Sequence, residues 1–195
     1  MSTLRTFIAI ELDGGLKEDL ARLQDHLQAE MPPRSVRWVR PEGIHLTLKF
    51  LGDTTPGQVE QVKEALARVA AGAGPITFGL GGVGCFPHTR RPRVVWVGLH
   101  EPTGDLAHLR DAVEAHVAPL GFPTEKRPFS PHLTLGRVQR HASNAEVRQV
   151  GEAVAASAIG DIGEMTATGL SYIRSKLTPG GAVYTTLARL ELTAK

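Results

Sequence analysis

The tetrapeptide His-Leu-Thr-Leu occurs twice in the chain, at residues 45–48 and again 87 positions later at residues 132–135. Each copy lies in an alternating segment typical of a β-strand, and each is followed by a turn and an amphipathic helix. A four-residue match alone has little weight, but the shared context indicates that the chain consists of two related halves. This repeat restricts the possible folds more than any other feature, because each half of the chain must contain an equivalent strand followed by an equivalent helix.

The remaining pattern mixes strands and helices, with many hairpin returns, and predicts an α+β fold rather than a doubly wound parallel sheet. Extended segments are expected at residues 6–12, 36–39, 44–51, 76–80, 94–99, 132–138, 165–174 and 182–192, with a long Gly/Pro/Arg loop between 80 and 94. Helices are expected at 15–30, after an N-cap at Thr55, at 104–118, and after the capping-box sequence Ser143-Asn144-Ala145-Glu146. Because no linker divides the sequence, residues 1–195 are expected to form one domain.

The repeat places two kinds of polar side chain on one strand face. Side chains alternate along a strand, so His45 and Thr47 point away from the leucines of the first motif, as His132 and Thr134 do in the second. If a pseudo-twofold axis relates the halves, both pairs converge on one cleft. One neutral imidazole then takes a proton from an attacking oxygen while the other, protonated, gives one to a leaving oxygen. With the threonine hydroxyls donating to non-bridging oxygens, this arrangement suits in-line displacement at phosphorus. For either copy alone, a strand with a polar face is the simpler interpretation.

These motifs resemble the twin His-x-Thr-x motifs of the 2H phosphoesterase superfamily. Within it, the chain is most similar to the bacterial and archaeal RNA 2′,3′-cyclic phosphodiesterases, also called 2′-5′ RNA ligases. The similarity extends over nearly the whole chain, through residues 5–10, 44–52, 96–98, 131–137 and 180–184. It implies two pseudo-symmetric lobes of antiparallel sheet with helices outside and an active-site cleft between them, to which each lobe contributes one motif.

The resemblance also implies a reaction. Such an enzyme opens RNA 2′,3′-cyclic phosphodiester ends to 2′-phosphomonoesters and, in the reverse sense, can join such an end to a 5′-hydroxyl. By the family pattern, His45 is the proton donor to the departing 3′-oxygen, and His132 is the proton acceptor that activates water. Because the two motifs are nearly identical, the sequence alone leaves these two roles open. No metal and no cofactor are expected, since neither motif has the further His, Cys or acidic residue that a zinc site requires.

Three arginines are candidates for binding phosphate. Arg137 lies five positions after the second motif histidine, where the family often has a phosphate-binding arginine. Strict alternation would place it on the opposite strand face, so a bulge or twist near Gly136 is needed to bring it into the cleft. Arg90 and Arg93 belong to the basic segment 88–93, an expected loop that can contact RNA phosphates. For all three, an exposed arginine without a ligand is the alternative.

Three aromatic residues, Phe86, Phe129 and Tyr172, are candidates for a ring on which a nucleobase stacks, although core packing is the alternative for each. Residues 79–84 match the dinucleotide-binding pattern G-x-G-x-x-G, but the prolines that follow exclude the helix that this pattern requires. The lone Cys85 excludes an intramolecular disulfide and has no signature of a thiolate nucleophile.

Composition gives weaker information about partners and location. The 22 Lys and Arg residues against 20 Asp and Glu give a net charge of +2, so any basic surface must be local. Hydrophobic residues make up 42% of the chain, which excludes disorder, and no apolar run is long enough for a signal sequence or a membrane span. We expect a cytoplasmic protein without membrane contact, monomeric and without a protein partner, that acts on RNA ends.

Two other functions are compatible with the motifs. One is a 2H phosphodiesterase acting on small cyclic nucleotides, and the other is a non-catalytic protein that binds RNA ends. Retention of both histidines and both threonines argues against the second. Turnover of an oligonucleotide compared with a mononucleotide 2′,3′-cyclic phosphate distinguishes the first from an RNA enzyme.

Overall fold

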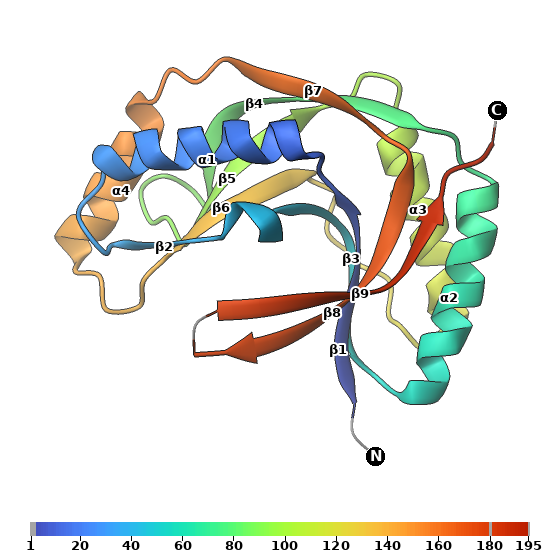
Figure 1. Cartoon of the computed structure of the whole chain (residues 1–195). Helices are drawn as coiled ribbons and strands as arrows, with labels where there is room; N and C mark the ends of the chain where they lie inside the picture. The colour runs from blue at the N-terminus through green and yellow to red at the C-terminus, as the bar shows by residue number, and fades with distance from the viewer. Residues whose placement is uncertain (1–2, 180, 195) are drawn as a thin grey trace.

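Nine strands within residues 3–179 and 181–194, the part of the chain that the computed structural model describes, form one curled antiparallel sheet (Figure 1). Their order across the sheet is β7-β4-β5-β6-β3-β1-β8-β9, with β2 beside β6. The strands are β1 (Leu4–Glu11), β2 (Val36–Trp38), β3 (His45–Thr54), β4 (Ile76–Phe86), β5 (Val94–His100), β6 (His132–Val138), β7 (Asp161–Ala167), β8 (Gly169–Thr178) and β9 (Gly181–Glu191). The helices of the same residues are α1 (Gly14–Ala29), α2 (Pro56–Ala71), α3 (Asp105–Val117) and α4 (Asn144–Ala156), with short 3-10 helices η1 (Pro41–Gly43) and η2 (Ala118–Leu120). The predicted α+β fold is confirmed.

The sheet divides between β6 and β3 into two halves of matching order. On one side of this boundary the strands are β6, β5 and β4, and on the other they are β3, β1 and β8. Each His-Leu-Thr-Leu motif begins the strand next to the boundary. The two lobes implied by the resemblance are therefore two halves of one continuous sheet, related by a pseudo-twofold axis that passes between the motif strands.

Helices α1 and α3 are exchanged between the halves. α1 follows β1 in the chain but packs against β7, and Gln24 on α1 donates a 2.8 Å hydrogen bond to the Leu135 carbonyl of β6. Conversely, α3 follows β5 but packs against β3, where Glu114 forms a buried ion pair with Lys49. α2 stays with β8 and β9, and α4 stays with β4. Figure 1 shows the result, with α1 and α4 over one half and α2 and α3 over the other.

Local signals in the sequence account for the helix starts. Thr55 caps the start of α2 as predicted and forms a reciprocal capping box with Gln58. The capping box predicted for Ser143 and Glu146 is present at the start of α4. Each helix buries an apolar stripe that faces the sheet, which is where most helical stability in proteins originates. Within the described residues, no helix combines the length and apolar character needed to cross a membrane.

The glycine-rich residues 81–86 form a strand, so the loop predicted between residues 80 and 94 is wrong for these residues and is confined to residues 87–93. β4 continues to Phe86 in a ladder with β5. Gly84 permits this pairing because the Trp96 ring lies over its backbone, and a Cβ at residue 84 would be 2.3 Å from Cζ2 of that ring. Gly82 has a φ of +66° at the point where the register shifts, which is a β-bulge that favours glycine. The glycines therefore allow close packing and a bulge, whereas the sequence pattern alone indicated a loop.

Residues 161–178 form two strands where the sequence predicts one over 165–174. β7 pairs with β4 and β8 pairs with β1, in different halves of the sheet. The chain changes partner at Thr168, where neither a proline nor a turn dipeptide interrupts the alternation. The turn predicted at 178–181 includes Gly180, which lies outside the described residues, but β8 and β9 on its two sides pair as predicted.

The two faces of the sheet differ in their packing. The main apolar core lies on the face covered by the helices and includes Leu46 and Leu133, both fully buried. A second, small cluster of Phe7, Ala9 and Ile173 lies on the opposite face. Phe7 of this second cluster packs against His45 of the first motif.

Candidate active site

The two motif strands are neighbours in the sheet. β3 and β6 run antiparallel and meet at the pair Leu46–Leu133. Both leucines are 0% exposed, so the side chains that alternate with them lie on the opposite face. The two copies of the motif therefore present their polar residues on the same surface of the molecule.

The pairing register arranges the four polar residues as a rectangle. It places His45 across from Thr134 and Thr47 across from His132, so each histidine faces the threonine of the other motif. All four side chains are half-buried. The two histidines occupy diagonal positions, which in antiparallel strands are about 7–8 Å apart, enough for a phosphorus atom and its oxygens to lie between the imidazoles. The structure thus brings together the four residues predicted to act on the substrate.

Both histidines are held by the same kind of hydrogen bond. Nδ1 of His45 lies 2.8 Å from the Gly43 carbonyl oxygen, and Nδ1 of His132 lies 2.7 Å from the Ser130 carbonyl oxygen. A carbonyl only accepts, so Nδ1 carries the proton in each ring. Nε2 is then the nitrogen available to the substrate, as an acceptor in the neutral ring and a donor in the protonated one. In both cases the carbonyl belongs to the residue two positions before the histidine, as the pseudo-twofold axis requires.

Aromatic rings surround His45. Phe7 stacks on the imidazole with ring centroids 4.6 Å apart, and Tyr184 meets it edge-on at 5.1 Å. Burial lowers the pKa of His45, and the hydrogen bond to Gly43 and the negative charge of Glu11 offset part of this effect. Glu11 pairs with His45 across the β1–β3 ladder. These three neighbours of His45 were not predicted as site residues, because their proximity depends on the strand order β3-β1-β8-β9.

His132 has different neighbours. Phe86 meets its ring edge-on at 4.8 Å, and the Trp96 ring lies 6.4 Å away. Phe86 also packs on Trp96, with centroids 5.2 Å apart. The predicted aromatic Phe86 therefore lies at the site, where its ring borders the second histidine.

The bulge required to turn Arg137 into the cleft is present. In the β5–β6 ladder, Trp96 pairs with Thr134, but the adjacent Val95 pairs with Gly136, so β6 has one extra residue at this point. The extra residue reverses the alternation and returns Arg137 to the face that carries the motif histidine. Arg137 is exposed.

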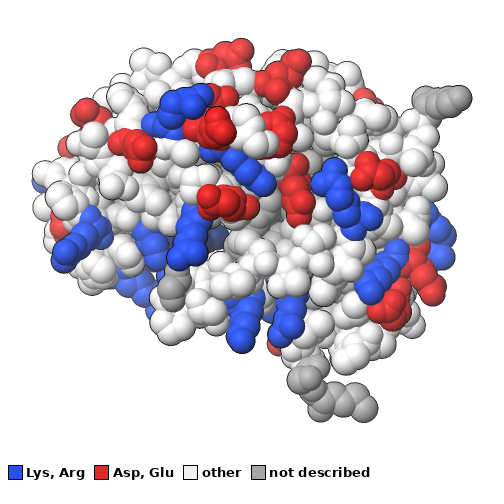
Figure 2. Space-filling model, viewed as in Figure 1, with Lys and Arg blue, Asp and Glu red and all other residues white. Residues whose placement is uncertain are grey.

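The charge of Arg137 also acts on an aromatic ring of the site. Burial raises the pKa of Tyr184, and the positive charges of Arg137 and Arg5 act in the opposite direction. Tyr184 contacts His45, so the positive charge of Arg137, which lies on the strand of the second histidine, acts on a ring that borders the first. Figure 2 shows Lys and Arg side chains around the hollow between η1 and the β8–β9 hairpin.

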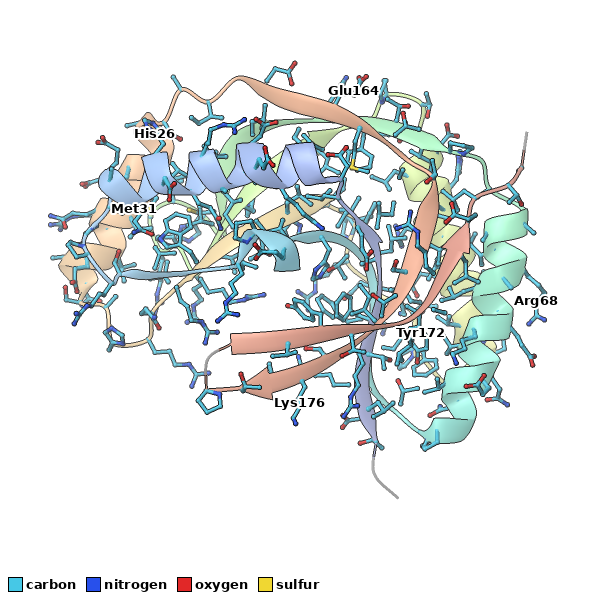
Figure 3. All side chains as sticks on the ribbon, viewed as in Figure 1. His26, Met31, Arg68, Glu164, Tyr172 and Lys176 are labelled. Atoms are coloured by element: carbon cyan, nitrogen blue, oxygen red, sulfur yellow. The ribbon has the colours of Figure 1, made fainter. Side chains whose placement is uncertain are left out.

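The prediction of Tyr172 as a base-stacking ring is wrong. Tyr172 is 0% exposed, and its hydroxyl donates a 3.3 Å hydrogen bond to Oγ1 of Thr6. It pairs with Ile8 on the core face of the sheet, beside α2. In Figure 3, Tyr172 lies inside the fold, whereas Lys176 of the same strand lies further along, on the part of the β8–β9 hairpin that extends away from the helices. A fully buried ring has no free face on which a nucleobase can stack.

The other predicted contacts are partly accessible. Phe129 is half-buried against the core, and the Arg110 guanidinium lies 5.1 Å from its ring centre, so one ring face is covered. Arg90 and Arg93 are exposed in the loop between β4 and β5. The carbonyl of Arg93 accepts a hydrogen bond from the Val138 N–H, which joins this loop to the end of the second motif strand.

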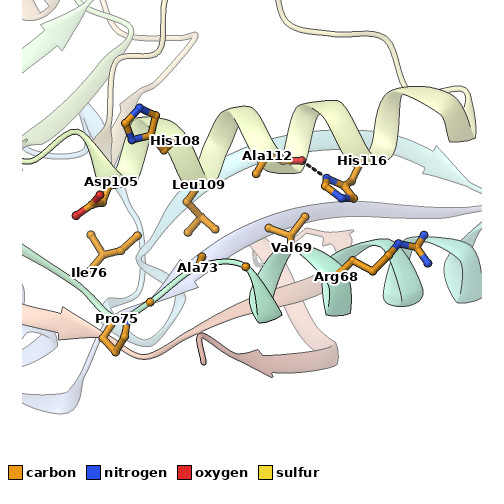
Figure 4. Close-up of a pocket in the computed structure, with 12 residues that line it drawn as sticks. Arg68, Val69, Ala73, Pro75, Ile76, Asp105, His108, Leu109, Ala112 and His116 are labelled. Carbon is orange, nitrogen blue, oxygen red and sulfur yellow. Dashed lines mark hydrogen bonds between the residues drawn. The ribbon is translucent and has the colours of Figure 1, made fainter. Parts of the chain in front are cut away.

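Two cavities lie away from these residues. One, of about 400 Å³, lies between α2 and α3 and is lined in part by Arg68, Asp105, His108 and His116 (Figure 4). His116 is held there by a 2.8 Å hydrogen bond from Nδ1 to the Ala112 carbonyl. The other, of about 640 Å³, lies between α1 and α4. Neither includes a motif residue, so neither contributes a group to the histidine site.

Comparison with known proteins decides the family. A family model described as LigT like phosphoesterase matches the chain twice, over residues 10–96 and 97–184. This chain is a LigT-like phosphoesterase. Each match contains one histidine motif, in agreement with the internal repeat, and the predicted membership of the 2H superfamily is confirmed.

Relatives of this LigT-like phosphoesterase are found in archaea and bacteria. It is 33% identical over 183 residues to the RNA 2′,3′-cyclic phosphodiesterase of Methanothermobacter thermautotrophicus, covering 93% of this chain and 95% of the relative. It is 34% identical over 188 residues to that of Archaeoglobus fulgidus, covering 96% and 100%. Among solved structures, a Thermus thermophilus protein is similar with a TM-score of 0.80 at 27% identity, covering 96% of this chain and 97% of that one. E. coli LigT complexed with 3′-AMP has a TM-score of 0.78 at 25% identity, covering 99% and 100%.

Proposed function

We propose that this LigT-like phosphoesterase hydrolyses RNA 2′,3′-cyclic phosphate ends to 2′-phosphomonoesters by metal-independent acid–base catalysis. The proposal rests mainly on the rectangle of His45, Thr47, His132 and Thr134, in which both imidazoles have Nδ1 bound to a carbonyl and Nε2 free. The names of the curated relatives support the substrate class.

In this mechanism, Nε2 of His132 takes a proton from water as the water oxygen attacks phosphorus. The bond between phosphorus and the 3′-oxygen breaks, and that oxygen takes a proton from Nε2 of His45. Thr47 and Thr134 donate hydrogen bonds to the non-bridging oxygens, and Arg137 neutralises their charge. With a 5′-hydroxyl in place of water, the same step forms a 2′-5′ linkage.

The surroundings of the histidines favour this division of roles. The 3′-oxygen remains on the nucleoside after the ring opens, so the proton donor must lie beside the nucleoside. His45 has the aromatic neighbours Phe7 and Tyr184, which suit a nucleoside, whereas Arg137 extends from the strand of His132. Arg90 and Arg93 are proposed to contact RNA phosphates further from the cyclic end, and Phe129 stays a candidate ring.

The product of hydrolysis tests the proposal directly. An oligonucleotide 2′,3′-cyclic phosphate is incubated with the protein in excess EDTA, and the product is identified by phosphorus NMR. We expect a 2′-phosphate, formed at the same rate with and without EDTA. A 3′-phosphate would contradict the assigned roles of His45 and His132, and activity that requires a divalent ion would contradict the metal-free mechanism.

Faster turnover of a mononucleotide would favour a small cyclic nucleotide as substrate, and binding without turnover would indicate a non-catalytic RNA-binding protein.

The charge of Glu11 is expected to affect the pH dependence. His45 must be protonated to act as the acid, so kcat/KM falls as pH rises through its pKa. Glu11 favours the protonated ring, so Glu11→Gln should lower that pKa and move the alkaline limb of kcat/KM to lower pH. The exposed Glu18 on α1 provides the control, because Glu18→Gln should leave the profile unchanged. A shift of the acidic limb, with the alkaline limb unchanged, would contradict His45 as the acid and assign it as the base.

A further inference from the structure

The two carbonyls that hold the motif histidines belong to different kinds of local structure. Gly43, which holds His45, is the last residue of η1, and its own N–H makes a 2.8 Å backbone hydrogen bond within that turn. Ser130, which holds His132, lies in an irregular segment. Among the described residues, the backbone of 123–130 makes no hydrogen bond with another backbone group. The position of the Ser130 carbonyl is therefore fixed by side chains.

Phe129 is the anchor of this segment. The other side chains of residues 123–130 are exposed, whereas the Phe129 ring is half-buried and packs against the main core. Pro128, directly before it, has no N–H with which to fix the backbone. Because Ser130 is the next residue, a shift of the ring moves the carbonyl that holds His132.

Arg110 of α3 fixes this ring. Its guanidinium carbon lies 5.1 Å from the centre of the Phe129 ring, within the range of a cation–π contact. The Arg110 side chain is only 18% exposed, and Nη1 lies 3.1 Å from the carboxylate of the neighbouring Asp111. Nε is buried with no hydrogen-bond partner in the described part of the chain, which is unfavourable for a guanidinium N–H. The contact with the ring offsets part of this cost and keeps the guanidinium in its inward position.

The same helix holds the other end of the segment. Glu114, four positions after Arg110 and so on the same face of α3, accepts a 3.4 Å hydrogen bond from the Glu125 N–H. Lys49, the ion-pair partner of Glu114, donates to the Pro123 carbonyl. One face of α3 therefore fastens both ends of the segment that leads into the second motif.

We propose that Arg110 is a positioning residue for His132. The guanidinium holds the Phe129 ring, the ring holds the adjacent Ser130 carbonyl, and this carbonyl keeps the imidazole proton on Nδ1. Nε2 then has the lone pair that a base requires, whereas the other tautomer would have an N–H there and could not accept a proton. This inference rests on the proposed function, in which His132 is the base, and it names a residue of α3 that controls that role.

Steady-state kinetics test the proposal through kcat. Arg110→Met keeps an unbranched apolar stem and removes the charge. It should lower kcat for an oligonucleotide 2′,3′-cyclic phosphate about 10- to 100-fold with KM nearly unchanged, because a misplaced base slows the chemical step without weakening substrate binding. Arg110→Lys keeps a cation over the ring and should recover most of the loss.

Two further variants show whether the ring contact is responsible. Phe129→Leu, which removes the ring face, should lower kcat as Arg110→Met does. The double variant should be no worse than either single variant, because both changes break one contact. Arg148→Met is the matched control, since Arg148 forms an exposed ion pair with Glu152 on α4 and its loss should change neither kcat nor KM.

The protonated nitrogen of each imidazole gives a readout that does not depend on turnover. It is identified in ¹⁵N–¹H correlation spectra of the neutral rings, assigned by comparison with His45→Ala and His132→Ala. In the unmodified protein we expect the proton on Nδ1 of both rings. In Arg110→Met the proton of His132 should move in part to Nε2, whereas His45, held by Gly43, should be unchanged and serves as the internal reference.

The outcomes separate this proposal from its alternatives. An unchanged His132 tautomer in Arg110→Met would overturn it, and a raised KM in the same variant would show that the Phe129 ring contacts the substrate. An equal tautomer change in both histidines would show that Arg110 supports the fold as a whole, which also contradicts a specific role. If the unmodified protein does not turn over the RNA end, the proposed function is wrong, but the tautomer of His132 still decides whether Arg110 positions this ring.

Discussion

His45→Ala and His132→Ala are each expected to lower kcat/KM for an RNA 2′,3′-cyclic phosphate by about 10²–10⁴-fold, the usual contribution of a positioned proton donor or acceptor. In each ring a hydrogen bond from Nδ1 to a backbone carbonyl fixes the imidazole and leaves Nε2 available for proton transfer. Replacement by alanine removes this positioned proton carrier. Steady-state assays of the purified variants measure the effect.

The double variant provides the sharper test. Two groups that act in one transition state are strongly non-additive, so His45→Ala/His132→Ala should be little worse than either single variant. Losses that multiply would mean that the two histidines act in separate steps. Thr47→Ala, which removes a hydrogen bond and no proton carrier, should cost less than either histidine and serves as the reference for a milder defect.

Glu114→Ala is expected to lower the free energy of unfolding by about 3–5 kcal/mol, because it leaves the Lys49 ammonium buried without its counter-charge. The pair spans 2.8 Å, and its side chains are 4% and 9% exposed. After the change, the Pro123 carbonyl remains as an acceptor for Lys49 but supplies no negative charge. Urea denaturation monitored by circular dichroism gives the free energy.

Two further variants identify the cause. Glu60→Ala breaks the exposed Glu60–Lys63 pair of α2 and should change the free energy of unfolding by about 0.5 kcal/mol or less. Lys49→Met combined with Glu114→Leu replaces the buried charges with apolar groups and should recover most of the loss. If Glu114→Ala were no more damaging than Glu60→Ala, the buried pair would contribute little to joining α3 with β3.

The sequence was most informative where a local pattern decides the structure. Alternation placed both motif histidines on one face, and capping patterns located the starts of α2 and α4. Alternation also predicted the bulge in β6. Without one extra residue in this strand, Arg137 would lie on the face opposite His132.

Long-range pairing accounts for most of what the sequence did not reveal. Phe7 and Tyr184 reach His45 because β1 lies between β3 and β8, an order that no local pattern encodes. The burial of Tyr172 has the same cause, since it depends on the pairing of β8 with β1 and on the packing of α2 against β8. The strand character of residues 81–86 depends on the Trp96 ring above Gly84, a contact with another strand.

The exchanged helices α1 and α3 have a mechanical consequence. Each half of the sheet is covered by a helix that enters from the other half, and the buried contacts of Gln24 with β6 and Glu114 with β3 fasten those helices in place. Moving the halves apart about the motif strands would pull both helices from the surfaces that bury them and expose apolar area on each. The exchange of helices therefore opposes a hinge motion between the two halves. The spacing between His45 and His132 is set by the fold itself, and the substrate we propose enters a site whose width is fixed before it binds.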